Sequence, residues 1–210
     1  MIMVSLPDIV QKFAESLQHV DSQRPKYKNY QEGIGPFPEH KAIALIAIDL
    51  NNRKLPFSVK TNVVYPGSKQ KCDIRIFSNA NHYDWAIEVK LLRFLGDNGK
   101  PNDNMLTHIL SPYSQHKSAL NDCVRLANSS FQAKKAILIY GFEHDKWPLE
   151  PAIEAFEHLA NERLANEYLA NKIPVEYQLG TRYVSCFTGL IHPIHKQGKV
   201  FGWELIQKYR

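Results

Sequence analysis

The chain has 210 residues, of which 44% are hydrophobic and 22% charged, proportions typical of one globular domain. Its longest apolar run, residues 42–48, is far shorter than the roughly 20 residues that a membrane-spanning helix needs, so no membrane is expected. Three cysteines without close spacing argue against a disulfide framework or a zinc cluster, and favour a reduced, cytoplasmic protein. The formal net charge of +5 modestly favours a polyanionic partner, although many proteins are mildly basic.

The N-terminal part predicts one amphipathic helix followed by a basic loop. Ser5 and Asp8 have the spacing of a capping box, and apolar residues at helical spacing continue to Val20. Residues 21–38 hold three prolines and predict an irregular loop. The basic residues that alternate there with tyrosines are Arg24, Lys26 and Lys28. Such a loop could grip a phosphate backbone and stack on bases, or it could simply be solvated.

The rest of the chain predicts a central mixed sheet flanked by helices. Turn residues at 66–68 and 78–81 separate three segments rich in β-branched and aromatic residues, which indicates a three-strand meander. In chain order we expect a helix from Pro38 to about Ile48, strands at 57–65, 70–77 and 83–92, a helix at 113–127, a strand at 135–140, a helix at 149–171, and strands at 182–191 and 199–206. This order predicts a single α/β domain.

The second and third predicted strands fix which side chains share a face. If they pair as a hairpin around residues 78–81, Ile74 lies opposite Ile87 and Ile76 lies opposite Trp85. Both pairs are apolar, so they mark the face that packs against the core. A slip of one residue would move every side chain to the other face, and the hydrophobic pattern therefore enforces this register.

The same register places an acidic pair on the opposite face. Asp73 lies opposite Glu88, and Lys90 points the same way because it follows Glu88 by two positions. Two carboxylates at about 5 Å between Cβ atoms repel one another, and a divalent cation would resolve the conflict. Mg²⁺ suits such hard oxygen donors, with the main-chain carbonyl of Val89 as a further ligand. The alternative is a structural ion cluster on the sheet.

These residues resemble a known family. Asp73 followed by Glu88-Val89-Lys90 on consecutive strands is similar to the PD-(D/E)XK nucleases, also called restriction-endonuclease-like. Their αβββαβ core would cover about residues 38–140, with the helix and strands at about 149–206 as additions. The resemblance implies that Asp73 and Glu88 bind the metal and that Lys90 is catalytic. Cys72 stands where the motif has proline.

The resemblance adds two further candidates for the site. Glu39 occupies the place of a glutamate that many members carry on the helix before the meander, and it would be a third metal ligand. Gln115 occupies the place of a glutamine on the helix after the meander, found in exonuclease-type members. Lys117 on that helix is a candidate phosphate contact.

The expected function is therefore that of a Mg²⁺-dependent deoxyribonuclease, expected to be an endonuclease, with Mn²⁺ as a substitute metal. DNA is the expected partner, and a homodimer is one way to cut both strands. The residues expected to contact the DNA backbone are Arg24, Lys26, Lys28, Lys69, Lys71, Arg75, Arg93 and Lys117. The alternatives are a catalytically inactive nucleic-acid-binding module of the same fold, and a partner-binding protein whose acidic pair bonds to Lys90 and Arg75.

Two other motifs carry weaker predictions. His192 and His195 have a spacing found among metal ligands, but no third ligand is near in sequence, so two loop histidines are expected. Cys72 is expected to face the core together with Ile74, because the two residues are two positions apart on one strand.

Overall fold

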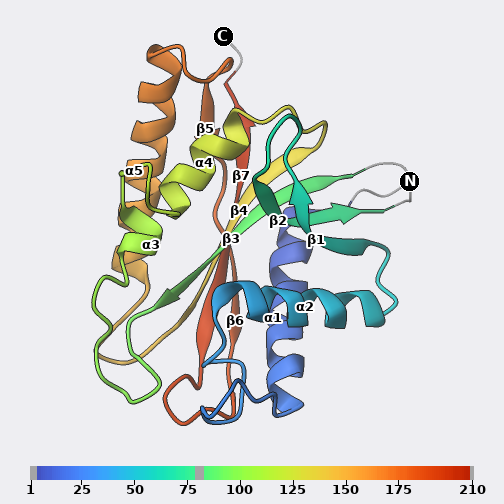
Figure 1. Cartoon of the computed structure of the whole chain (residues 1–210), viewed down its shortest axis with the longest axis vertical. Helices are drawn as coiled ribbons and strands as arrows, with labels where there is room; N and C mark the ends of the chain where they lie inside the picture. Colours follow the sequence, from blue (N-terminus) through green and yellow to red (C-terminus); the bar gives the residue numbers. More distant parts are fainter. Residues whose placement is uncertain (1–3, 79–82, 209–210) are drawn as a thin grey trace.

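The computed structural model describes residues 4–78 and 83–208, which form an α/β fold (Figure 1). The helices are α1 (Leu6–Ser22), α2 (Glu39–Asn52), α3 (Thr107–Leu110), α4 (Ala119–Ala127) and α5 (Glu150–Leu169). The strands are β1 (Ser58–Val64), β2 (Lys71–Phe77), β3 (Trp85–Arg93), β4 (Lys134–Phe142), β5 (Tyr177–Leu179), β6 (Tyr183–Phe187) and β7 (Gly198–Gln207). No helix in the described part of the chain is both long and apolar enough to span a membrane.

Seven strands of the described residues join in one mixed sheet, in the order β1-β2-β3-β4-β7-β5, with β6 also paired to β7. The first three form an antiparallel meander, β4 runs parallel to β3, and β7 runs antiparallel to β4. A parallel pair needs a crossover connection, and α3 and α4 supply it between β3 and β4. The prediction of an α/β protein with a central mixed sheet flanked by helices is confirmed at this level.

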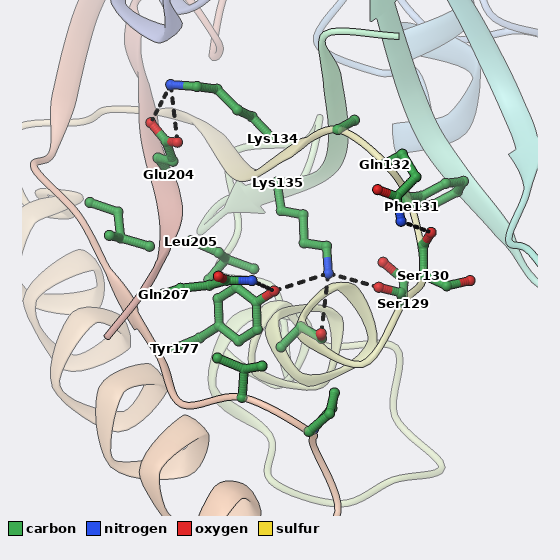
Figure 2. A pocket seen from close by; sticks show the side chains of 15 residues that line it. Ser129, Ser130, Phe131, Gln132, Lys134, Lys135, Tyr177, Glu204, Leu205 and Gln207 are labelled. Carbon is green, nitrogen blue, oxygen red and sulfur yellow. Dashed lines mark hydrogen bonds and ion pairs between the residues drawn. The ribbon is translucent and has the colours of Figure 1, made fainter. Parts of the chain in front are cut away.

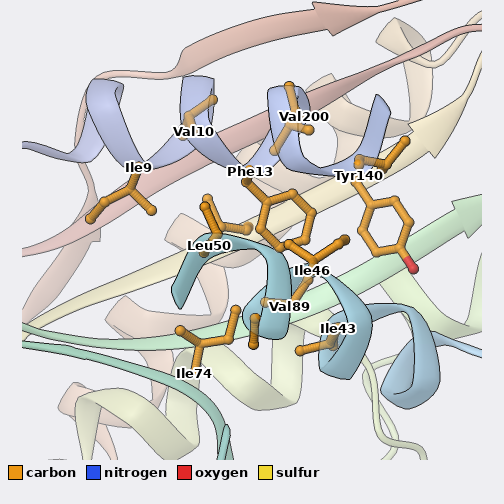
Figure 3. Packing of buried hydrophobic residues seen from close by; sticks show 14 of the residues in the cluster. Ile9, Val10, Phe13, Ile43, Ile46, Leu50, Ile74, Val89, Tyr140 and Val200 are labelled. Atoms are coloured by element: carbon orange, nitrogen blue, oxygen red, sulfur yellow. The ribbon is translucent and has the colours of Figure 1, made fainter. Parts of the chain in front are cut away.

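The helices cover both faces of the sheet (Figure 1). One face packs against α1 and α2, and the other packs against α4 and α5. In the first layer Phe13 of α1 and Ile46 of α2 meet Val89 of β3 and Tyr140 of β4 (Figure 3). Burial of a large apolar side chain stabilises a fold by about 1.5–3 kcal/mol. This layer therefore fixes the position of the start of α2, which carries Glu39, relative to β3, which carries Glu88 and Lys90.

The first helix begins where the capping pattern predicts. The Ser5 hydroxyl accepts a hydrogen bond from the main-chain N–H of Asp8, and it also contacts the Asp8 carboxylate. The side chain of Ser5 thereby satisfies an N–H group that has no partner within the helix. The apolar positions of α1 are buried against the sheet, as expected, and the helix ends at Ser22 rather than near Val20.

The helix expected at residues 113–127 is shorter than predicted. It begins at Ala119, because Ser118 rather than Ser111 is its N-cap and accepts from the N–H of Asn121. Residues 111–117 form a loop instead, held by hydrogen bonds from the Asn121 side-chain amide to the carbonyls of Tyr113 and His116. The short elements α3 and β5 were not predicted. The turn expected at residues 78–81 lies mostly outside the described residues.

Candidate active site

The hairpin register predicted for β2 and β3 is confirmed. Ile74 pairs with Ile87 and Ile76 pairs with Trp85, and these side chains lie in the core layer under α1 and α2. Glu88 and Lys90 therefore point to the opposite face, toward α4. Their side chains are only 1% and 7% exposed, so Glu88 and Lys90 are buried, whereas Asp73 is half-buried.

The β2–β3 ladder stops at the acidic pair. The register runs from Ile76 to Ile74 and goes no further toward Cys72. Beyond this point the main-chain N–H of Val89 donates to Oδ2 of Asp73 at 2.9 Å. A carboxylate thus takes the place that a main-chain carbonyl has in a regular ladder. The side chain of Asp73 is held at the point where the two strands separate.

Asp73 lies close to Glu88, because the N–H of the next residue in the chain, Val89, donates to the Asp73 carboxylate. Burial raises the pKa of Glu88 well above its ordinary value, and the charges of Asp122 and Asp73 raise it further. The hydroxyl of Tyr65 and the guanidinium of Arg125 both bond to Oε1 of Glu88, the latter at 2.9 Å, and fix its orientation.

Lys90 is held by carboxylates on two sides. Its Nζ lies 2.6 Å from Oδ2 of Asp122 and 3.6 Å from Oε1 of Glu39. Burial alone would lower the pKa of Lys90, but the charges of Asp122 and Glu39 outweigh it and raise the pKa. Lys90 therefore carries its positive charge throughout the physiological range.

Glu39, placed in the site by resemblance alone, lies next to it in space. It is the first residue of α2, and its Oε2 accepts from the main-chain N–H of Leu91 at 2.7 Å. Burial raises the pKa of Glu39, while Lys90 opposes the shift. The carboxylate of Glu39 thus lies beside Lys90 on the side opposite Asp122.

Asp122 and Arg125 are the members of this network that the sequence did not predict. Asp122 is fully buried on α4, and its Oδ1 lies 2.5 Å from Nη2 of Arg125. Their spacing of three residues predicts an ion pair on one helix face, but nothing local indicates that the pair meets β3. Burial raises the pKa of Asp122, and Lys90 and Arg125 oppose the shift.

A cleft of about 650 Å³ opens above the acidic pair. Asp73, Glu88, Lys90 and Glu39 line it, and so do several of the predicted contact residues. Three lysines at its edge, called here the lysine rim, are Lys69, Lys71 and Lys117. Gln115 also lines the cleft, but it and Lys117 belong to the loop 111–117 and not to a helix.

The remaining basic candidates lie elsewhere. Arg75 is buried, donates to the carbonyl of Trp85 and lies between aromatic rings. The prediction that Arg75 contacts a phosphate backbone is therefore wrong. Arg93 bonds to the carbonyl of Gly35 at 2.7 Å and lines a neighbouring cavity that shares Glu39 with the cleft. The residues Arg24, Lys26 and Lys28 of the loop 21–38 do not line the cleft; Arg24 instead pairs with Glu32 at 3.0 Å.

The prediction that Cys72 shares a face with Ile74 is wrong. Cys72 is buried, but it packs in the layer under α4, with Ala86 and Leu92. The regular alternation of β2 is lost at Asp73, where the ladder with β3 ends. Burial raises the pKa of the Cys72 thiol, so it stays protonated and acts as a small packing group.

No protein-family model, curated protein or solved structure matches this chain.

Mg²⁺ binds oxygen donors, which the carboxylates of Asp73 and Glu88 can supply. Within residues 4–78 and 83–208, no three His, Cys, Asp or Glu side chains form a ready-made metal cluster. Mg²⁺ is usually held by one or two carboxylates together with waters and substrate phosphates, and the Asp73–Glu88 pair fits that pattern. The Val89 carbonyl, another of the predicted ligands, accepts a hydrogen bond from the Lys90 ammonium at 3.3 Å.

His192 and His195 lie in a loop, as predicted, and their rings are buried. They stack with their centroids 4.8 Å apart, and the ring of His144 lies 5.9 Å from that of His195. Nε2 of His195 meets Oδ1 of Asp97 at 3.2 Å. Burial, together with the nearby charges of His192, Arg93 and His144, lowers the pKa of His195 to about 3. These histidines are therefore neutral packing groups at physiological pH.

A second cavity, of about 620 Å³, lies at the C-terminal end of α4 (Figure 2). The buried ammonium of Lys135 donates there to the carbonyls of Ala127 and Ser129, at 3.2 and 2.8 Å, and to the Tyr177 hydroxyl at 3.3 Å. A cation is favoured at the carbonyl end of a helix. Lys135 thus has three hydrogen-bond acceptors, one of which is the carbonyl of the last residue of α4.

Proposed function

We propose that this chain is a metal-dependent nuclease with a restriction-endonuclease-like core, which hydrolyses phosphodiester bonds of DNA at the Asp73–Glu88–Lys90 site. The order α2, β1, β2, β3, α4, β4 supports the core assignment. We further propose that the protein is cytoplasmic, that it uses Mg²⁺ or Mn²⁺, and that it acts as a monomer or as a homodimer.

One observation carries the proposal. Two carboxyl groups from adjacent strands, Asp73 and Glu88, line one cleft together with the buried ammonium of Lys90 and the lysine rim. Like charges that face each other across a sheet are destabilising, so a fold selected only for stability would separate them. Strongly shifted carboxyl pKa values in a cleft are common at catalytic sites.

In this proposal each side chain has a defined task. Asp73 and Glu88 would hold Mg²⁺, which when bound polarises a phosphoryl oxygen and lowers the pKa of a water molecule. Because its pKa is raised, Lys90 would serve as a fixed positive charge and hydrogen-bond donor rather than as a base. It would stabilise the negative charge that develops on the phosphorus centre. Gln115 and Lys117 would contact the phosphate from the loop.

A second candidate is a catalytically inactive nucleic-acid-binding or partner-binding module of the same fold. The observation in its favour is the closed ion network, in which Lys90 and Arg125 already neutralise charge on Glu88 and Asp122. In this alternative Arg125 pairs with Glu88, whereas the sequence predicted Arg75 in that role.

A plasmid-nicking assay separates the two functions. We expect the wild type to nick supercoiled DNA with Mg²⁺ or Mn²⁺ and to stop when EDTA is added. Asp73→Asn should lower the rate by about 10²-fold or more, since it removes charge from the metal-binding pair. Asp145→Asn, at an exposed position, is the matched control and should cut at the wild-type rate.

Two results would count against the nuclease. Equal rates for the wild type and Asp73→Asn would remove Asp73 from the mechanism. Salt-sensitive DNA binding without cleavage in either metal would favour the inactive binding module.

A further inference from the structure

The cleft above the acidic pair is small and deep. Its volume of about 650 Å³ lies in the range that holds a ligand of drug size, which is the size of one or two nucleotides. Glu88 at its floor is almost completely shielded from solvent. A phosphate can reach this floor only if the chain that carries it enters the cleft. Duplex DNA is stiff, with a persistence length of about 150 base pairs, whereas a single strand bends readily.

Uncharged polar side chains line the cleft together with the acidic residues and the lysine rim. They are Asn62, Gln70, Ser114, Gln115 and Asn121. Amide side chains both donate and accept hydrogen bonds, as base edges do. Watson–Crick edges are open to such contacts only in unpaired nucleotides. The lining of the cleft therefore suits a strand whose bases are exposed.

An exposed aromatic ring lies beside His116, a residue that lines the cleft. Tyr113 is 61% exposed, and its ring meets that of His116, a residue of the cleft wall, at 5.8 Å between centroids. Its loop is braced by the Asn121 amide, which donates to the Tyr113 carbonyl at 2.7 Å, and by a 2.6 Å contact between Ser111 and His116. A base stacks well on an aromatic ring held in a fixed position.

From the size, lining and rim of the cleft, we propose that it binds a single strand of nucleic acid. The backbone lies along the lysine rim, and one base stacks on Tyr113. As the substrate class of the site, this inference rests on the proposed function, but binding can be measured without cleavage. DNA and RNA strands share the chemistry recognised here, so both belong in the test.

The experiment is fluorescence anisotropy with labelled oligonucleotides of about 12 nucleotides, within the range of single-strand site sizes. The full chain is titrated against oligo-dT, oligo-rU and a blunt duplex of equal length, with Ca²⁺ present and Mg²⁺ absent. We expect at least one single strand to bind about tenfold or more tightly than the duplex. The ratio of the dT and rU affinities assigns the strand as DNA or RNA.

Three variants test the placement of the strand. Tyr113→Ala should weaken single-strand binding by about 5- to 150-fold, the effect of losing one base–aromatic stack, whereas Tyr113→Phe should bind like the wild type. Tyr30→Ala, at a 47% exposed ring on the other basic loop, is the matched control and should bind normally. Replacing Lys69 and Lys71 together by Ala should lower the salt slope by about 1.4, since each phosphate contact to a single strand contributes about 0.7.

Duplex binding equal to or tighter than single-strand binding would overturn the inference, as would weakening by Tyr30→Ala but not by Tyr113→Ala. Single-strand binding without Mg²⁺- or Mn²⁺-dependent cleavage would leave it standing and remove the nuclease activity. Plasmid nicking by a chain that binds duplex more tightly than single strands would support the nuclease activity and overturn the single-strand inference.

Discussion

Asp122→Asn tests how much the ion pairs of Asp122 with Lys90 and Arg125 stabilise the fold. The substitution keeps the size of the side chain and removes one negative charge at a fully buried position. Both oxygens of Asp122 are engaged, at 2.5 Å with Arg125 and at 2.6 Å with Lys90. The variant therefore weakens two ion pairs at once.

The expected loss follows from what remains around the two cations. Removal of one partner of a buried ion pair typically costs 3–5 kcal/mol, because a charge is left uncompensated. Here Arg125 keeps Glu88 at 2.9 Å, and Lys90 keeps Glu39 at 3.6 Å. Neither cation is stranded, so we expect the lower end, about 3 kcal/mol. For a domain of this size that corresponds to a fall in Tm of about 6–12 °C.

Urea denaturation of the wild type and the variant measures the loss directly. Asp145→Asn, an exposed change of the same chemistry, should stay within about 0.5 kcal/mol of the wild type. The m value should be unchanged, which shows that the variant unfolds from the same compact state. Adding Lys90→Met to Asp122→Asn should cost less than the sum of the two single changes, since the residues are in contact. A loss below about 1 kcal/mol for Asp122→Asn would refute the reasoning.

The other predictions concern the metal, acid and backbone packing. Ca²⁺ or Mg²⁺ should raise the Tm of the wild type, by the equivalent of about 2.7 kcal/mol at one hundred times Kd, and thermal scans of Asp73→Asn should show no such rise. The folded chain holds the pKa of His195 at about 3. Below pH 6.5 the unfolded chain therefore binds a proton at this residue that the folded chain does not. The contribution of His195 to the free energy of unfolding should fall by about 1.4 kcal/mol per pH unit from 6.5 toward 3. Urea titrations of the wild type and of His195→Phe between pH 7 and 5 check this, and equal pH slopes for the two proteins would contradict it. Gly198→Ala would place a Cβ 1.9 Å from the carbonyl oxygen of Gly141, where only backbone could yield; we expect a loss of about 3 kcal/mol or more, and an unchanged Tm would show that the strands can move apart.

Local patterns predicted the parts of this fold that depend on neighbouring residues. The register of β2 and β3 followed from which side chains are apolar, because a shift of one residue would bury Asp73 and Glu88 on the core side. The start of α1 followed from the capping chemistry of Ser5. In both cases a few adjacent positions carry enough information to select one arrangement.

Contacts between distant segments escaped prediction. Asp122 reaches Lys90 only because α4 packs across β3, and the sequence of α4 alone reads as an ordinary helix with an internal ion pair. Ser111 and Ser118 are both acceptable N-caps, and the choice between them depends on how Asn121 braces the loop. Arg75 has the charge of a surface residue, but aromatic rings from other segments enclose it.

The carboxylate of Asp73 is also part of the backbone scaffold, since it accepts the N–H of Val89. Asn offers an acceptor of the same reach, Glu is one carbon too long, and Ala would leave a main-chain donor without its partner, at about 1–3 kcal/mol. An inactive Ala variant would thus confound lost chemistry with a loosened hairpin. Under the proposed function, position 73 is constrained both by the chemistry and by the hairpin, and substitutions there would not separate the two constraints.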